Sequence, residues 1–301
     1  MSATWQSLPL LFKTSVVSNL DLKSRRSLLF CSKQDKELVD KCPVVLQSLE
    51  IGMTHESRAR IIIRETNGTR IDVENQDMFS IIQILQLPYL KTKELIILCP
   101  GSEIQQMRNL ITEISSLINA KKLVKLRTKQ FYWRCFPDEA DEFIEFLKLL
   151  NENELEIIHN DMNNFSSDQM TEVGGMKQWM NAKEIWLGNG EVSSVDQFLH
   201  VHNCNVYFSK LKVEDIWKMI LSFQSRNLPI GSSFDLFTEN PPKLDDVFKM
   251  YNVVPNHQPI IPDDIGIIGR HTQRFKTGSD DKMLVVRNTE LGIRGNVLKK
   301  D

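Results

Sequence analysis

The sequence predicts an α/β fold in which a small set of three short N-terminal helices precedes an irregular α/β solenoid similar to leucine-rich repeats. Residues 7–42 carry apolar side chains at helical spacing, with a capping residue before each run. From residue 45 the pattern changes to short strand-like runs, and beyond residue 90 strand-like and helical segments alternate about every 20–30 residues. That step is typical of a solenoid with one strand and one helix in each repeat. The composition, 41% hydrophobic and 25% charged, provides for a sizeable core.

Three helices are expected in the N-terminal segment. Ser7 can cap the first, in which an apolar stripe recurs every four residues at Phe12, Val16 and Leu20. Asp21 can cap a second helix, and Ser32 with Asp35 has the spacing of a capping box for a third. Pro43 closes the segment, which is too short to bury a core of its own.

Strand-like runs follow the helices. In residues 46–52, Leu49 and Ile51 fall on one side of an expected strand. Residues 60–74 predict a hairpin around Asn67-Gly68, because both residues accept the positive φ angles of a type I′ turn. We expect this hairpin to cover the first edge of the sheet and a late strand within residues 281–293 to lie at the far end.

Each later repeat is expected to carry an apolar pair in its strand. The pairs begin at Leu95, Val124, Leu155, Ile185, Val206 and Phe234. Helices are expected between them at residues 102–120, 138–150 and 213–223. The first of these opens with Ser102 and Gln105 at capping-box spacing, and the last is expected to bury Ile216, Trp217, Ile220 and Leu221. Parallel strands joined by such crossovers stack into a curved α/β array.

Charge and cysteine content exclude several classes of protein. A net charge of -2 and a pI near 6.3 give nothing that would draw the chain to nucleic acid or to an anionic membrane. The cysteines are widely spaced and form no C-x-x-C pair, which is typical of reduced, intracellular proteins. We expect no signal peptide, and the sequence has no apolar run of about twenty residues. We therefore expect a cytoplasmic or nuclear protein with no nucleic-acid and no membrane partner.

No motif in the sequence supports catalysis. G-x-S-x-G, H-E-x-x-H and glycine-rich phosphate loops do not occur. His200, His202 and Cys204 alternate along one strand, but no fourth ligand accompanies them, so we expect no metal site. Trp186 and Trp217 are expected to pack between helix and sheet, with an exposed binding groove as the alternative. We expect no catalytic residue, no cofactor and no enzymatic activity.

The N-terminal segment "SLPLLFKTSVVSNLDLKSRRSLLFCSKQDKELV" resembles an F-box, and we assign residues 5–43 to it. The positions that match the F-box pattern are Leu8, Pro9, Phe12, Val16, Leu20, Leu22, Arg25, Leu28, Cys31 and Ser32. Asp35 departs from it, since many F-boxes carry a tryptophan close to this position.

The remainder, residues 45–295, resembles the FTH domain, the C-terminal half of a large nematode F-box family. The segment "QWMNAKEIWLGNG" at residues 178–190 is similar to the most recognisable FTH motif, and Phe198 and His200 follow where a Phe-Leu-His step is usual. The chain is thus identified as resembling a nematode-type F-box protein with a C-terminal FTH domain.

This resemblance implies a substrate receptor of an SCF-type ubiquitin ligase. In such a complex the F-box binds a Skp-type adaptor, and the adaptor binds a cullin. The second domain would bind a protein substrate, which is unknown. A patch too small to bury its own leucines can complete its core against a partner. The residues that would meet the adaptor are Leu8, Pro9, Phe12, Val16, Leu20, Leu22, Arg25 and Leu28. The strand face of a solenoid is a usual binding surface, so the candidates for substrate contact are Lys125, Arg127, Glu184 and Trp186.

Two alternatives stay open. The chain could be a non-catalytic α/β repeat scaffold with no link to ubiquitination, in which case substitutions in the F-box would leave adaptor binding unchanged. It could also be an enzyme with an unrecognised site, which predicts a pocket with convergent polar groups.

Overall fold

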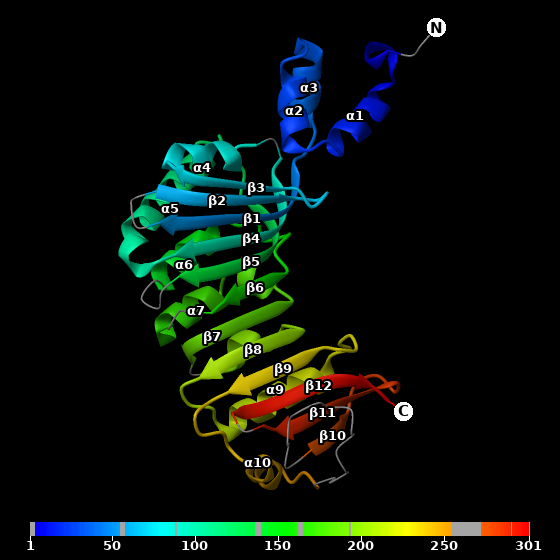
Figure 1. Ribbon diagram of the computed structural model, residues 1–301. Coiled ribbons are helices and arrows are strands. Elements are labelled where there is room, and N and C mark those ends of the chain that lie inside the picture. The colour runs from blue at the N-terminus through cyan, green and yellow to red at the C-terminus, as the bar shows by residue number, and fades with distance from the viewer. Residues whose placement is uncertain are drawn as a thin grey trace. The chain divides into compact units, whose positions relative to one another are not determined.

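The computed structural model describes residues 4–54, 58–87, 89–135, 140–161, 165–192, 194–254, 272–289 and 291–300 (Figure 1). It mixes α-helices with β-strands, as the sequence predicts. The chain forms two compact units. The first unit contains Met1–Tyr132 and Leu149–Glu154, and the second contains Trp133–Lys148 and Leu155–Asp301. The three N-terminal helices therefore lie in the same compact unit as the first strands. The division into domains at residues 5–43 and 45–295 stays a prediction.

The N-terminal module comprises η1 (Trp5–Ser7), α1 (Leu10–Ser18), α2 (Leu22–Leu29) and α3 (Lys33–Lys41). Two predicted caps are confirmed: Asp21 accepts a hydrogen bond from the Ser24 amide (2.6 Å), and Ser32 accepts one from the Asp35 amide (3.1 Å). The cap predicted at Ser7 is wrong, because α1 begins after Pro9 and Ser7 belongs to the preceding 3-10 turn.

The sequence suggests that this segment is too short to bury a core of its own, but the module has a small one. Its fully buried members are Val17, Leu38, Val39 and Cys42, and Trp5, Leu20, Leu28 and Leu29 pack against them. The indole N–H of Trp5 donates to Asp35 Oδ1 at 2.7 Å, which ties η1 to α3.

The sheet of the first unit has the strand order β4-β1-β2-β3. Its elements are β1 (Val45–Thr54), β2 (Arg58–Glu65), β3 (Arg70–Gln76), α4 (Met78–Leu85), β4 (Lys91–Cys99), η2 (Gly101–Glu103) and α5 (Ile104–Asn119). β1 and β4 run parallel, whereas β1, β2 and β3 are antiparallel. The predicted hairpin beside β1 is confirmed. Leu49 and Ile51, expected on one side of a strand, are both buried in β1.

The hairpin turn differs from the predicted type I′. Only Gly68 has a positive φ (89°), whereas a type I′ turn needs positive φ at both central residues. The Glu65 amide donates to Thr69 O (2.9 Å), and Asn67 Oδ1 accepts from the Thr69 amide (2.8 Å). The asparagine thus stabilises the turn through its side chain rather than through its backbone conformation.

The start of α5 also differs from the prediction. Pro100 leads into η2, and α5 begins at Ile104 without a side-chain cap, so Ser102 and Gln105 form no capping box. The helix buries Met107, Leu110, Ile111 and Ile114.

The strands of the second unit follow the order β6-β7-β8-β9-β12-β11-β10. Their bounds are β6 (Ile157–Asn160), β7 (Glu184–Val192), β8 (Asn203–Phe208), β9 (Ser233–Phe237), β10 (Thr272–Lys276), β11 (Lys282–Asn288) and β12 (Gly292–Lys299). β6 to β9 are parallel, and the last three strands add in antiparallel fashion beside β9. A late strand within residues 281–293 is therefore confirmed. β5 (Arg127–Cys135) begins in the first unit and ends in the second.

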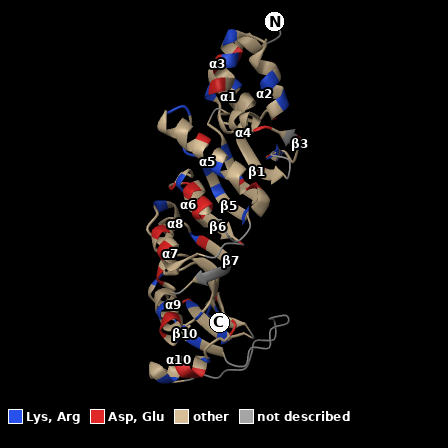
Figure 2. Ribbon diagram, turned by 90° about the vertical axis from the view of Figure 1, so that its left-hand side faces the viewer, with Lys and Arg blue, Asp and Glu red and all other residues tan. Residues whose placement is uncertain are grey.

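Helices connect the parallel strands of the second unit. They are α6 (Ala140–Lys148), α7 (Ser167–Gly174), α8 (Lys177–Met180) and α9 (Val213–Ser225), with η3 (Asp196–Phe198) between β7 and β8. α10 (Leu244–Met250) lies between β9 and the antiparallel strand β10. Acidic residues occupy the first turns of α6, α7, α9 and α10, where their negative charge interacts favourably with the positive end of the helix dipole. Those of α6, α7 and α10 are red in Figure 2. α9 buries Ile216, Met219 and Ile220, but Leu221, which was expected inside, is 46% exposed.

The predicted strand positions are right at Leu95, Ile185, Val206 and Phe234 and too early at Val124 and Leu155. Leu126 forms an isolated parallel bridge with Leu150 ahead of β5, and the chain turns between Asn151 and Glu154 before β6 begins. Buried apolar residues in these connections therefore have the same sequence pattern as strand residues. The likeness to leucine-rich repeats stays a prediction.

Two further features bear on function. None of the helices in the described ranges is long and apolar enough to cross a membrane. The five cysteines are free thiols, of which Cys31 is exposed and Cys42, Cys99, Cys135 and Cys204 are buried.

Candidate functional site

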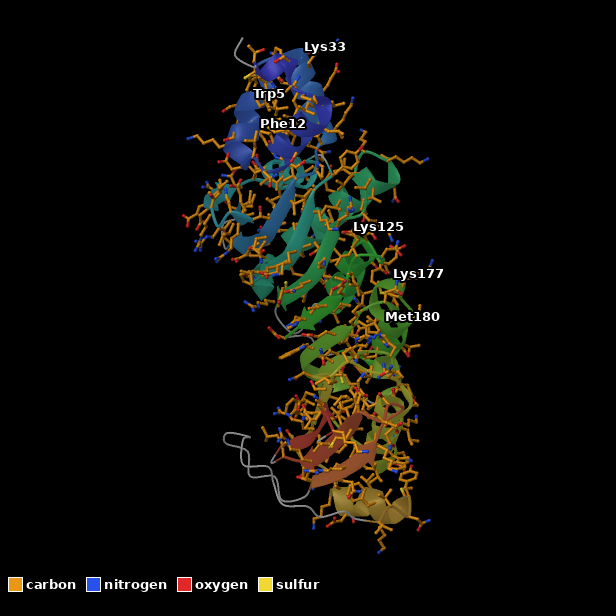
Figure 3. The ribbon with its side chains drawn as sticks, turned by 90° about the vertical axis from the view of Figure 1, so that its right-hand side faces the viewer. Trp5, Phe12, Lys33, Lys125, Lys177 and Met180 are labelled. Carbon is orange, nitrogen blue, oxygen red and sulfur yellow. The ribbon has the colours of Figure 1, made fainter. Side chains whose placement is uncertain are left out.

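The N-terminal module leaves large apolar side chains uncovered at its surface. Leu10, Leu11 and Phe12 in the first turn of α1 are 70%, 86% and 54% exposed, and Phe30 at the end of α2 is 80% exposed. Figure 3 labels Phe12 and Trp5 on this module. The three consecutive exposed residues of α1 form a group, and grouped apolar exposure marks interaction surfaces, whereas single exposed apolar residues are ordinary. The module thus offers a surface for a protein partner.

The residues predicted to meet an adaptor divide into two groups. Pro9 and Phe12 are exposed, and Leu8 and Val16 are half-buried beside them. Leu20 and Leu28 pack against the module's core, and Leu22 is half-buried at the start of α2. Three further candidates were missed: Leu10, Leu11 and Phe30. The run "PLLF" contains more apolar residues than one helical stripe can bury, and this excess could have identified the first two.

Arg25 is buried at the contact between the N-terminal module and the sheet of the first unit. Its side chain is 4% exposed and donates to Cys42 O (3.1 Å), to Pro43 O (2.9 Å) and to Leu20 O (3.3 Å). Burial lowers the pKa of this guanidinium from its ordinary value. From the sheet side, Glu65 Oε1 accepts the Leu22 amide at 2.6 Å and so caps α2 beside Asp21. Arg25 is therefore a buried residue that holds the module in position against the sheet.

Lys125 and Arg127, two of the predicted substrate contacts, line a pocket of about 230 Å³ in the first unit. Both are paired: Lys125 Nζ lies 2.9 Å from Glu152 Oε2, and Arg127 Nε lies 2.5 Å from Glu154 Oε1. Lys91 Nζ is 2.7 Å from the other oxygen of Glu154. Burial raises the pKa of this carboxyl, but the hydrogen bonds from Lys91 and Arg127 outweigh it, and the net effect is a lowered pKa. Figure 3 labels Lys125.

The other two predicted contacts, Glu184 and Trp186, lie on a partly exposed strand face of the second unit. The strand register places five side chains in one row across β6, β7, β8, β9 and β12: His159, Trp186, Asn205, Asp235 and Arg294. α9 lies behind the strands in Figure 1, and alternate residues such as Val206 and Leu236 are fully buried. The opposite face therefore carries the polar and aromatic row.

Trp186 does not pack in the core, so that expectation is wrong. It is 39% exposed and stacks on His159, with ring centroids 4.9 Å apart and planes at 12°. Trp217 is half-buried and stacks on Tyr251 at 4.7 Å. The single-sequence pattern could not decide this, because an aromatic residue fits either side of a strand.

Glu184 is held beside this stack. Its carboxylate lies 3.6 Å from His159 Nε2 and accepts a hydrogen bond from Asn203 Nδ2 at 3.2 Å. The neighbouring His159 is the main cause of a lowered pKa for Glu184. The arrangement fits a charged contact surface. Across the described part of the chain, no group of three or more His, Cys, Asp or Glu side chains could hold a metal ion.

Comparison with known proteins finds similarity to one domain family, which covers the segment described next. No curated protein matches this chain. The motif residues Gln178 and Trp179 are both buried, and the Trp179 indole donates to Gln197 O at 2.9 Å, which ties α8 to η3. This motif lies inside a stretch that runs from α5 to the end of α10. Residues 108–251 match the family model of the FTH domain.

Proposed function

We propose that this chain is an F-box substrate receptor that docks on a Skp-type adaptor and thereby joins a cullin-based SCF ubiquitin ligase. The observation that carries the proposal is the uncovered apolar surface of a helical module whose own core has only four buried members. The match to the FTH domain supports it, because that domain is generally associated with F-box proteins. The likeness of residues 5–43 to an F-box supports it independently.

In this function the chain carries out no bond chemistry. It raises the effective concentration of a bound target at the conjugating enzyme. The adaptor surface comprises Leu8, Pro9, Phe12 and Val16, to which we add Leu10, Leu11 and Phe30. Leu20, Leu22 and Leu28 support this surface from behind, and Arg25 holds the module on the sheet.

The target side of the receptor is formed by the FTH domain, which we place within residues 45–295 and expect to have leucine-rich-repeat-like architecture. Two surfaces are candidates for target contact. One is the pocket wall with Lys125 and Arg127, and the other is the strand face with Glu184 and Trp186. We expect such a receptor to work in the cytoplasm or nucleus.

The adaptor contact is tested with Leu11→Asp combined with Phe12→Asp. Both side chains are more than half exposed, so the fold should tolerate the change, while two carboxylates would enter the apolar interface. The wild-type chain co-expressed with a panel of Skp-type adaptors is expected to elute as a stoichiometric complex in size-exclusion chromatography. The double variant should weaken this complex at least about 100-fold, since hot-spot losses exceed about 2 kcal/mol each.

A matched control is Phe79→Asp, which alters a 66% exposed phenylalanine on α4 outside the module. This variant should retain the complex. If no adaptor in the panel binds wild type, the ubiquitin-ligase function is wrong and a scaffold function remains.

A further inference from the structure

The volume of the pocket in the first unit suits one or two protein side chains. It is bounded by the α4–β4 loop, the α5–β5 connection and the beginnings of β4 and β5. Buried leucines from these elements and from β1 form its apolar wall: Leu49, Leu85, Leu90, Leu95 and Leu123. Its volume of about 230 Å³ lies below the roughly 300–1,000 Å³ of pockets for small molecules and cofactors. One or two inserted side chains match this volume better than a cofactor does.

Two large apolar residues are exposed at the pocket. Tyr89 in the α4–β4 loop is 58% exposed, and Val124 in the α5–β5 connection is 63% exposed. Tyrosine is among the residues that dominate protein–protein contacts, because it provides a large rigid surface with one polar end. An occupant of the pocket would therefore cover apolar area that is now in water.

The backbone of the α4–β4 loop is strained at Tyr89. Tyr89 has φ of 48° and Lys121, which precedes the lining segment, has φ of 56°. Of the non-glycine residues that the structure describes, only one more, Asn252, has a positive φ. Bulky residues rarely adopt this conformation, and such strain concentrates at binding sites. Tyr89 is not buried, so packing does not account for its conformation. The positive φ of Lys121 has another cause, because this residue ends α5: its amide donates to Ile118 O, and the Lys122 amide donates to Leu117 O.

The charges of the lining favour an acidic occupant. Lys122, Lys125 and Arg127 line the pocket, against the single acidic residue Asp40. Lys125 and Arg127 are paired with glutamates, whereas Lys122 is exposed and has no ion pair with any residue the structure describes. A carboxylate brought beside the pocket would therefore meet an unpaired ammonium group.

We propose that this pocket binds a linear segment of a partner protein in which a large apolar side chain stands next to an aspartate or glutamate. The apolar side chain enters the leucine-lined pocket and covers Tyr89 and Val124, and the carboxylate lies against Lys122. The binding stands on the geometry of the first unit alone. That the segment belongs to a ubiquitination target rests on the proposed function.

The test uses the full chain and a display library of random linear twelve-residue peptides. Enriched peptides are expected to share a large apolar residue adjacent to Asp or Glu. The affinity of an enriched synthetic peptide, measured by fluorescence anisotropy, should fall at least tenfold for Val124→Glu and for Lys122→Glu. Lys177→Glu, at an exposed lysine on α8 outside the pocket lining, should leave the affinity unchanged.

Tyr89→Asn separates binding from folding. Asparagine adopts positive φ more readily than tyrosine, so the thermal unfolding temperature of this variant should equal or exceed that of wild type. Its peptide affinity should nevertheless fall at least tenfold, because the ring is lost. A residue needed only for structure would show the opposite combination.

Two results would overturn the proposal: a library without enriched peptides, or enriched peptides whose affinity is the same for wild type and the pocket variants. The adaptor complex provides the separate readout. Pocket variants should retain it, so its absence in wild type counts against the proposed function and leaves the peptide result untouched.

Discussion

Phe223→Ala is expected to lower the free energy of unfolding by about 3–5 kcal/mol. Phe223 on α9 is fully buried and meets Phe234 of β9 edge-to-face, with ring centroids 4.9 Å apart and planes at 77°. Truncation removes apolar area from the helix–sheet interface and leaves a cavity that the sheet cannot close. Urea unfolding followed by circular dichroism measures the loss.

Leu221→Ala is the matched control for this substitution. Leu221 lies two residues earlier on the same helix and is 46% exposed, so its truncation should change stability by about 0.5 kcal/mol or less. Sequence periodicity placed Leu221 in the core. Equal losses from both variants would therefore contradict the helix orientation described above.

Arg25→Met is expected to destabilise the joint between the module and the sheet, by about 3 kcal/mol. The methionine keeps much of the stem's packing, but the carbonyls of Cys42 and Pro43 lose their donors. These carbonyls lie where the chain leaves α3 for β1, so the module should also become more mobile. Amide hydrogen exchange should accelerate in α2 and at the start of β1.

Arg26→Met provides the comparison, because Arg26 is the next residue and its side chain is exposed. It should leave both stability and exchange near the wild-type values. If Arg25→Met proves as harmless as Arg26→Met, the guanidinium does not hold the module in place.

Local chemistry in the sequence predicted much of the secondary structure. Asp21 and Ser32 cap the helices assigned to them, and Asn67-Gly68 marks a hairpin. These features depend on residues a few positions apart, which a single sequence displays. The errors at Val124 and Leu155 have the opposite origin, because they depend on contacts made elsewhere in the chain. Leu126 forms a bridge with Leu150, so β5 begins only after the exposed Val124. Leu155 is buried in the connection before β6 begins.

The candidate surfaces were only partly predictable for the same reason. Lys125 and Arg127 were named, but the pocket that they line also needs Tyr89 and Leu49 from distant segments. The exposure of Trp186 depends on strand register across several strands. Arg25 matched a family pattern by position, and its buried role could be seen only in three dimensions.

One of the five cysteines is exposed, which gives the chain a single thiol for selective labelling. Cys31 is exposed and adjoins Phe30 of the module, whereas the other four cysteines are buried, and burial raises the pKa of Cys204. A maleimide dye under native conditions should therefore label Cys31 alone, with no engineered cysteine. Its emission would report directly whether another protein has covered the end of α2.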